Sequence, residues 1–210
     1  MIVVAEQYRS IPTEQLEPKD AYGLLSSLIV PRPIAFVSTI SPTGVENLAP
    51  FSFFVAGGAN PPSLAFSCVL DGLGREKDTL RNIRATGEFV VNIVHRALAD
   101  DMNRASASLP PEKSEWELTT LSSLPSVLVK PRRVATSLAQ FECRLFQVAE
   151  HGNGSSAARY VIGEIVVFHV LEAAMAGNRV NSSYVQPIAR LAGSDYLDLE
   201  ALSTFTLERP

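Results

Sequence analysis

The chain has 210 residues, of which 46% are hydrophobic and 19% charged, and its mean hydropathy is +0.13. This length and composition predict a single well-buried domain over residues 1–210, with a surplus of apolar residues that suggests an oligomer interface. The net charge of -4 and the pI near 5.4 give no basic surface for a phosphate backbone, which argues against nucleic-acid binding.

Cysteine content and hydropathy indicate the compartment. Cys68 and Cys143 each lie in an apolar, strand-like run, which argues against a disulfide scaffold and favours a reducing environment. The opening Met1–Ala5 is too short for the apolar region of a signal peptide and lacks a basic start. No stretch approaches the roughly 18 to 20 apolar residues that span a bilayer. We therefore expect a cytoplasmic protein that binds no membrane.

The first part of the chain reads as a helix followed by strands. Residues 20–30 place Tyr22, Leu25 and Ile29 at helical spacing, and Pro31 ends that helix. Strand-like runs follow at 34–40, 45–56 and 64–70. Ser41-Pro42-Thr43-Gly44 has the residues of a type I turn, which predicts a hairpin between the first two strands.

The second part alternates helices with strands. A helix is expected at 78–85 with Gly87 after its end, and another at 97–107. Residues 112–117 read as an exposed loop that Trp116 anchors. Further strands are expected at 89–94, 138–150 and 160–171. Strands outnumber helices and most connections are short, so the pattern predicts a mostly β (α+β) fold, an antiparallel barrel with peripheral helices.

Small polar residues interrupt the first two strands. Ser38, Thr39, Asn47 and Ser52 stand where a purely structural strand would carry Val, Ile or Phe. An unpaired buried hydroxyl or amide costs about 1 to 3 kcal/mol, so these groups need partners. The pattern leaves three possibilities open: the side chains face water, bond to other protein groups, or hold a ligand.

The triplet Lys77-Asp78-Thr79 stands where a loop enters a helix. Backbone N–H groups, the positive end of the helix dipole, a hydroxyl and an ammonium would converge there, as a phosphate site requires. The alternative is that Asp78 or Thr79 caps the helix and Lys77 is solvated. The upstream Gly72-Leu73-Gly74 lacks the third glycine of a dinucleotide-binding fingerprint.

Other chemistries have little support. His95, His151 and His169 have no ligand-type neighbours at metal-binding spacing. The serines lack the Gly-x-Ser-x-Gly elbow of a serine hydrolase. Cys68 has no evident cationic neighbour in the local sequence to lower its pKa, so an inert packing role is expected.

Five motifs, in order along nearly the whole chain, resemble the flavin reductase-like proteins with an FMN-binding split barrel. They are Arg32-Pro33-Ile34-Ala35-Phe36-Val37-Ser38-Thr39, Asn47-Leu48-Ala49-Pro50-Phe51-Ser52, Lys77-Asp78-Thr79 with Asn82-Ile83, Glu88-Phe89-Val90-Val91-Asn92, and Pro187-Ile188-Ala189-Arg190-Leu191.

The resemblance implies a six-stranded antiparallel split β-barrel, a homodimer, and FMN near the subunit interface. Carried over by position, the residues lining the isoalloxazine and ribityl chain would be Ser38, Thr39, Asn47, Ala49, Phe51, Ser52 and Ser67. The phosphate would be held by Lys77, Asp78 and Thr79, and Arg190 would be a further contact from either subunit. Pro50 has no N–H, so we expect backbone donors at Ala49 and Phe51 instead. Gly57-Gly58 departs from the family pattern and predicts a wider slot or a bulge.

The leading hypothesis is an FMN-dependent oxidoreductase in which NADH or NADPH delivers hydride to flavin N5. The reduced flavin would serve a second acceptor or a partner oxygenase, with no obligatory side-chain acid or base. The alternative is a non-catalytic FMN-binding electron carrier or redox sensor, and a plain structural barrel is a third possibility.

Overall fold

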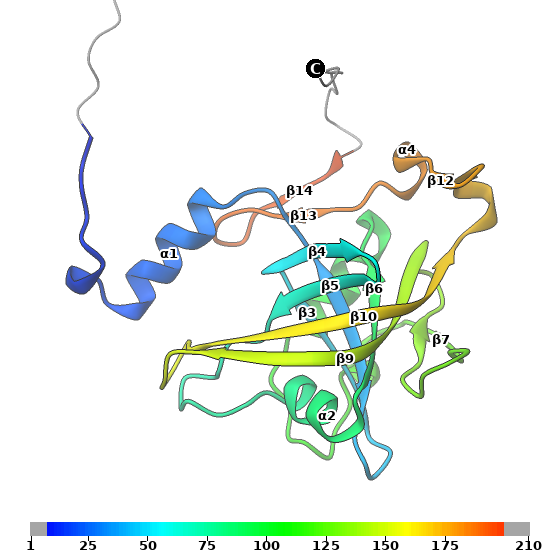
Figure 1. Cartoon of the computed structure of the whole chain (residues 1–210), viewed down its shortest axis with the longest axis horizontal. Helices are drawn as coiled ribbons and strands as arrows, with labels where there is room; N and C mark the ends of the chain where they lie inside the picture. The colour runs from blue at the N-terminus through cyan, green and yellow to red at the C-terminus, as the bar shows by residue number, and fades with distance from the viewer. Residues whose placement is uncertain (1–7, 200–210) are drawn as a thin grey trace, which may run out of the picture.

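The computed structural model describes residues 8–199, so the opening Met1–Ala5 lies outside the described residues. Seven antiparallel strands form one sheet in the spatial order β3-β2-β6-β9-β10-β5-β4 (Figure 1). The strands are β2 (Ala35–Ile40), β3 (Glu46–Phe51), β4 (Phe54–Ala59), β5 (Pro62–Ser67), β6 (Glu88–Ile93), β9 (Ala139–His151) and β10 (Ala158–Val170).

The sheet is rolled because its two edges are joined by a very short connection. β3 and β4 are the edge strands, yet only Ser52 and Phe53 separate them in the chain. The expected single strand over 45–56 is therefore two strands on opposite edges, and the predicted count of six becomes seven in the described sheet. No ladder closes the barrel in the described part of the chain, since β3 and β4 do not pair.

The predicted hairpin between β2 and β3 is confirmed. The N–H of Gly44 donates to the carbonyl oxygen of Ser41 at 3.0 Å, and Gly44 has a φ of +91°. The register pairs Thr39 with Asn47 and Val37 with Ala49 without a bulge. Because side chains alternate along a strand, these four face the same side of the sheet.

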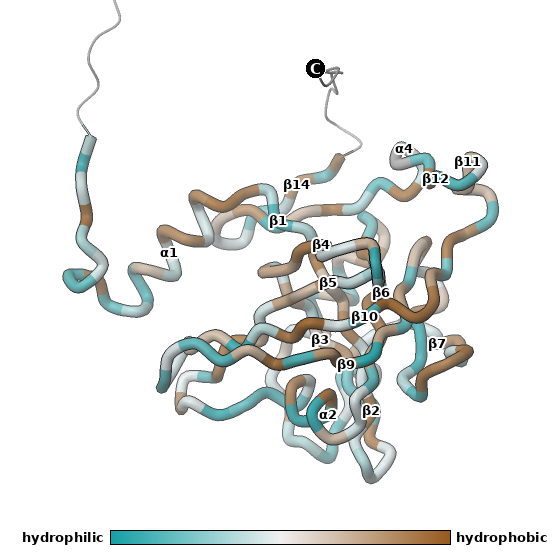
Figure 2. Tube along the Cα trace, viewed as in Figure 1, coloured by the Kyte–Doolittle hydropathy of each residue, from teal (hydrophilic) through white to brown (hydrophobic). Residues whose placement is uncertain are grey.

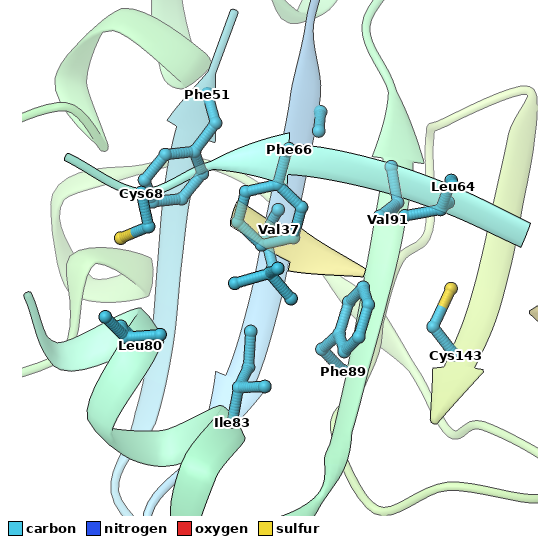
Figure 3. Packing of buried hydrophobic residues seen from close by; sticks show 12 residues of the cluster. Val37, Phe51, Leu64, Phe66, Cys68, Leu80, Ile83, Phe89, Val91 and Cys143 are labelled. Atoms are coloured by element: carbon cyan, nitrogen blue, oxygen red, sulfur yellow. The ribbon is translucent and has the colours of Figure 1, made fainter. Parts of the chain in front are cut away.

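The rolled sheet encloses the main hydrophobic core, and helix α2 (Asp78–Thr86) covers one opening (Figure 3). Phe66 packs against Phe51 and Phe89 at ring-centroid distances of 5.0 and 5.8 Å. Leu80 and Ile83 of α2 are fully buried in the same core. A second cluster on the other face of β2 and β3 includes Phe36, Leu48, Leu98, Met102 and Ile188.

Two glycines matter for this packing. A Cβ at Gly163 would lie 2.3 Å from Cζ of the buried Phe89, and the β9–β10 register shifts next to it. A Cβ at Gly57 would lie 2.5 Å from the Ser63 hydroxyl, and the β4–β5 register shifts between Ala56 and Ala59. The bulge expected at Gly57-Gly58 is therefore present.

The helices follow the sequence expectations with shifted ends. α1 covers Pro18–Leu28, two residues earlier at both ends than expected. α2 ends as predicted before Gly87, which has a φ of +72°. The helix expected over 97–107 is a 3-10 turn, η2 (Arg96–Leu98), followed by the short α3 (Ala99–Arg104). The expected loop at 112–117 contains the 3-10 helix η3 (Glu115–Leu118), and Trp116 anchors it on the second cluster as predicted.

The remaining elements are short. They are η1 (Thr13–Gln15), β1 (Arg32–Pro33), β7 (Ser123–Leu124), β8 (Arg133–Val134), η4 (Glu172–Ala174), β11 (Met175–Ala176), β12 (Arg179–Val180), α4 (Ser182–Val185), β13 (Ala189–Arg190) and β14 (Tyr196–Leu197). β1, β13 and β14 form a small sheet next to α1 (Figure 1). Within residues 8–199, none of the helices has the length and apolar character needed to traverse a lipid bilayer.

Candidate functional site

The start of α2 has no side-chain cap. Lys77 is the N-cap residue, in extended backbone conformation, and its side chain makes no capping hydrogen bond. Asp78 pairs with Arg81 one turn later, and the Thr79 hydroxyl oxygen accepts a 2.9 Å bond from Asn47 Nδ2. Neither residue caps the helix, so the alternative reading of the triplet as a simple cap is wrong. The positive end of the α2 dipole stays available to an anion.

Lys77 is the cation that remains available beside this helix end. Arg75 pairs with Asp71 at 2.9 Å, and Arg81 pairs with Asp78. In the described part of the chain Lys77 forms no ion pair, and its Nζ lies over the Phe51 ring, 5.7 Å from the centroid. Lys77 therefore joins the helix end to an aromatic surface.

The Gly72-Leu73-Gly74 stretch forms a turn that is held by the Asp71 side chain. One carboxylate oxygen of Asp71 accepts hydrogen bonds from the N–H groups of Leu73 and Arg75, both at 2.8 Å. These hydrogen bonds lower the pKa of Asp71, the bond from Arg75 most strongly. The N–H groups of Leu73 and Arg75 are used inside the turn, in agreement with the absence of a dinucleotide-binding fingerprint.

Strand β3 supplies the opposite wall. Asn47, Ala49 and Phe51 face α2, and Asn47 is held there by its bond to Thr79. The Leu48 N–H points away from β2 and donates to Oε2 of Glu115 at 3.1 Å. Because N–H directions alternate along a strand, those of Ala49 and Phe51 point toward β2. Ala49 and Phe51 thus contribute only their side chains to the wall. Their N–H groups, which we expected to act as donors to the flavin, point into the sheet.

A cavity of about 340 Å³ lies between β3, the start of α2 and the segment 105–111. Six of the eleven residues proposed from the sequence line it, namely Asn47, Ala49, Phe51, Lys77, Asp78 and Thr79. This volume lies at the lower end of the range typical of small-molecule sites. Polar groups at one end and an aromatic face beside them suit a flat amphipathic ring that carries a phosphate.

The remaining lining residues were not predicted from the sequence. They include Arg75, Glu115 and the small residues of the segment 105–109. Glu115 stands between the charged Lys113 and Glu117, so local sequence reads it as exposed, yet only 6% of its surface is accessible. Its burial on β3 is a tertiary contact that the local pattern does not reveal.

Ser38 and Thr39 are both buried, and protein groups bond both hydroxyls. The Ser38 hydroxyl donates to the carbonyl oxygen of Arg132 at 2.5 Å, on the opposite face of β2 from the cavity. The Thr39 hydroxyl oxygen accepts a 3.1 Å bond from Asn82 Nδ2. Neither residue lines the cavity. Of the three possibilities left open by the sequence, internal bonding holds for this pair.

The last three proposed residues also lie outside the cavity. The Ser52 hydroxyl accepts a 3.5 Å bond from Arg32 Nε. The Arg190 guanidinium lies over the Tyr196 ring, 4.4 Å from its centroid, and also bonds the carbonyl oxygen of Gly193. β13, which carries Arg190, lies across the sheet from α2 (Figure 1). The Ser67 hydroxyl is buried and has no partner among the described residues.

The cysteines and histidines form no reactive group. Burial raises the pKa of Cys68 to about 12, despite the nearby Lys77, and burial also raises the pKa of Cys143. Within the described residues no cluster of His, Cys, Asp and Glu could hold a metal ion. His169 contacts the buried Glu142 carboxylate at 2.6 Å. Both cysteines lie in the main hydrophobic core, in agreement with the packing role expected for Cys68.

Comparison with known sequences identifies relatives along the whole chain. Residues 26–184 match the family described as flavin reductase like domain. The uncharacterized protein YwrF of Bacillus subtilis is 39% identical over 201 residues, which cover 94% of this chain and 97% of YwrF.

Solved structures give the same result for the fold. Nitrilotriacetate monooxygenase component B from Bacillus cereus is 36% identical, with a TM-score of 0.91 over 97% of this chain and all of that chain. The 2-nitrobenzoate 2-nitroreductase NbaA of Pseudomonas fluorescens is 29% identical, with a TM-score of 0.84 over 95% of this chain and 96% of its own.

Proposed function

Since the chain belongs to the flavin reductase-like family, we propose that it is an FMN-binding oxidoreductase that uses NADH or NADPH as electron donor. One observation carries the proposal: the uncapped start of α2 and Lys77, which has no ion pair among the described residues, meet the Phe51 ring at one cavity. A helix N-terminus, a cation and an aromatic face placed in this way match the phosphate and the ring of FMN.

Each lining group has a distinct part in binding. Lys77 and the N–H groups at the start of α2 would hold the phosphate. The Thr79 hydroxyl accepts its bond from Asn47, which leaves its proton free to donate into the cavity. Ala49 and Phe51 would pack against the ribityl chain and the ring. Ser38, Thr39, Ser52, Ser67 and Arg190 lie outside the cavity, and our proposal does not need them as FMN contacts.

The bound flavin would supply the redox chemistry, accepting hydride at N5 and returning electrons to a second acceptor. The protein's contribution is to fix the ring so that one face stays open to the nicotinamide, because distance and orientation govern hydride transfer. No side chain in the cavity is required as an acid or base. A partner oxygenase or a small-molecule electron acceptor would receive the electrons.

A titration with FMN followed by a steady-state assay tests this function. We expect purified protein to bind FMN and to oxidise NADH or NADPH repeatedly when an acceptor is present. Binding of FMN with only a single, stoichiometric reduction would instead identify an electron carrier or sensor. Absence of FMN binding would refute both and leave a structural barrel.

The variants Lys77→Ala and Thr79→Ala test the phosphate assignment. Loss of a charge-assisted bond costs about 1.5 to 3 kcal/mol, so we expect Lys77→Ala to raise the dissociation constant for FMN by about tenfold or more. Thr79→Ala should raise it less. Lys19→Ala, at an exposed position of α1, is the matched control and should leave FMN affinity unchanged. Equal affinities in all four proteins would exclude the phosphate site at α2.

We also propose that the working form is a homodimer in the cytoplasm. Four apolar side chains of α1 and the residue after it, Tyr22, Leu25, Leu28 and Ile29, are exposed. Figure 2 shows this hydrophobic stretch of α1 standing apart from the barrel. A second copy of the chain would cover this stretch. Separately, the buried free thiols of Cys68 and Cys143 suit a reducing compartment. Light scattering at the mass of a monomer would contradict the dimer.

A further inference from the structure

Glu115 contributes a buried carboxylate to the wall of the cavity. It begins η3, and its Oε2 accepts the 3.1 Å hydrogen bond from the outward N–H of Leu48 on β3. The next outward position on this edge is Pro50, which has no N–H. Glu115 is therefore the side chain that ties the segment before η3 to the edge strand forming the cavity wall.

The other acids of the cavity are neutralised by arginines. Asp71 pairs with Arg75, and Glu76 pairs with Arg84 at 3.1 Å. Asp78 pairs with Arg81. Among the described residues, Lys77 and Glu115 are then the two lining charges without an ion pair, one of each sign. The field that an anion meets in the cavity depends on this pair.

Burial raises the pKa of Glu115, while hydrogen bonds from Leu48 and from its own backbone oppose that rise. The elements packed against η3 bring further charges, and the cavity holds no histidine. These charges are Glu46 on β3 and Asp100, Asp101 and Arg104 on α3. Glu117 lies on η3 itself, and Glu112 and Lys113 precede it. Asp101 is neutralised by Arg104 at 2.8 Å.

We propose that Glu115 is a specificity-determining residue that weakens the hold on phosphorylated flavin when it is ionised and permits tight binding when it is protonated. The inference rests on the proposed function. With Glu115 neutral, Lys77 leaves the cavity one net positive charge for the phosphate, and with Glu115 ionised the two charges cancel. The uncharged riboflavin has no phosphate to repel, so its affinity is independent of this charge.

Dissociation constants for FMN and riboflavin, measured from about pH 8.5 down to the lowest pH at which the protein stays folded, test the proposal. Glu115→Gln keeps an acceptor for the Leu48 N–H but cannot ionise, and Glu117→Gln is an exposed control on the same turn. For FMN, the wild-type constant should equal that of Glu115→Gln at low pH and exceed it by about tenfold at high pH. The ionisation of the phosphate in free FMN, with a pKa of about 6, is the same for both proteins and cancels in this ratio.

For riboflavin the ratio should stay constant, and Glu117→Gln should follow the wild type with both ligands. A constant ratio for FMN would overturn the proposal, and a ratio that changes equally for both flavins would show that Glu115 acts only by holding β3. Failure of the wild type to bind either flavin would instead refute the proposed function.

A measurement on the wild type alone covers the case in which Glu115→Gln does not fold. Riboflavin 5′-sulfate carries one negative charge over the whole pH range. Its affinity should fall by about tenfold as the pH rises, because only the charge of the protein changes. An affinity that is independent of pH would overturn the proposal.

Discussion

The polar residues of the β2–β3 hairpin and those at the start of α2 look alike in sequence but differ in the structure. Ser38 and Thr39 are buried, and Arg132 and Asn82 bond their hydroxyls. Lys77 has no ion pair among the described residues, and its side chain makes no capping hydrogen bond to α2. Polar groups inside a strand thus stabilise the barrel, whereas those at the helix start remain available to a ligand.

The difference has a physical cause. A buried strand has neighbours on every side, so an unpaired hydroxyl there is costly and finds a protein partner. A helix start has more N–H groups than the chain can bond, and they face outward. Variants that remove a bonded polar group inside the barrel should therefore change the free energy of unfolding. Variants at the start of α2 should instead change the affinity for a ligand.

The largest effect is expected at Glu142 on β9, a buried polar residue that, like Ser38 and Thr39, is bonded by groups of the protein. Its carboxylate is inaccessible and accepts hydrogen bonds from the N–H groups of Val127 and Leu128, both at 2.7 Å. Glu142→Gln places an amide N–H against one of these donors, so we expect a loss of about 3 kcal/mol in the free energy of unfolding. Urea denaturation at neutral pH measures it.

The pH dependence gives a second measurement on the same variant. Burial opposes ionisation of Glu142, but its hydrogen bonds and His169 together lower its pKa. The stabilisation is therefore present above the usual carboxyl range and is lost as the pH falls through the lowered pKa. Glu88→Gln is the control, since among the described residues the Glu88 carboxylate accepts only the Lys130 N–H. Equal stabilities of both variants would contradict the assignment.

A smaller effect is expected from Gly163→Ala, which tests the packing of the main hydrophobic core. The new methyl group would lie 2.3 Å from the Phe89 ring, which is fully buried in the main core. We expect a loss of about 2 kcal/mol, within the range for overpacked cores. Gly72→Ala is the matched control, because no atom lies within 4 Å of its Cβ position. Thermal denaturation that fails to separate the two variants would exclude this contact.

The fold could be predicted from local sequence wherever an element carries its own signals. Gly87 marks the end of α2, and the turn residues before Val45 mark the β2–β3 hairpin. The division of residues 45–56 into two strands could not be predicted. Phe51 and Phe54 are both apolar, and the chain changes edges between them because of the way the sheet rolls.

The candidate site was predictable in part for the same reason. Lys77 and Thr79 were identified because a helix start can be recognised locally. Ser38 was singled out as a polar residue in an apolar strand, but its partner, the carbonyl oxygen of Arg132, comes from another part of the fold. Arg190 was assigned by resemblance alone, and it bonds the carbonyl oxygen of Gly193. Glu115 was missed because its burial depends on the distant β3. Whether a polar residue is available to a ligand thus depends on partners that are remote in sequence, and the local pattern does not reveal them.

The smallest effect is expected from Ser38→Ala, which separates the two regions most directly. Its hydroxyl donates to the carbonyl oxygen of Arg132 at 2.5 Å, on the face of β2 turned away from the cavity. Removing it should cost about 1 kcal/mol in the free energy of unfolding, because the carbonyl oxygen loses its buried donor. The dissociation constant for FMN should change by less than about twofold, since no cavity contact is lost. If FMN affinity fell strongly while stability stayed the same, Ser38 would be a ligand contact like the residues at the start of α2, and the flavin would reach the other face of β2.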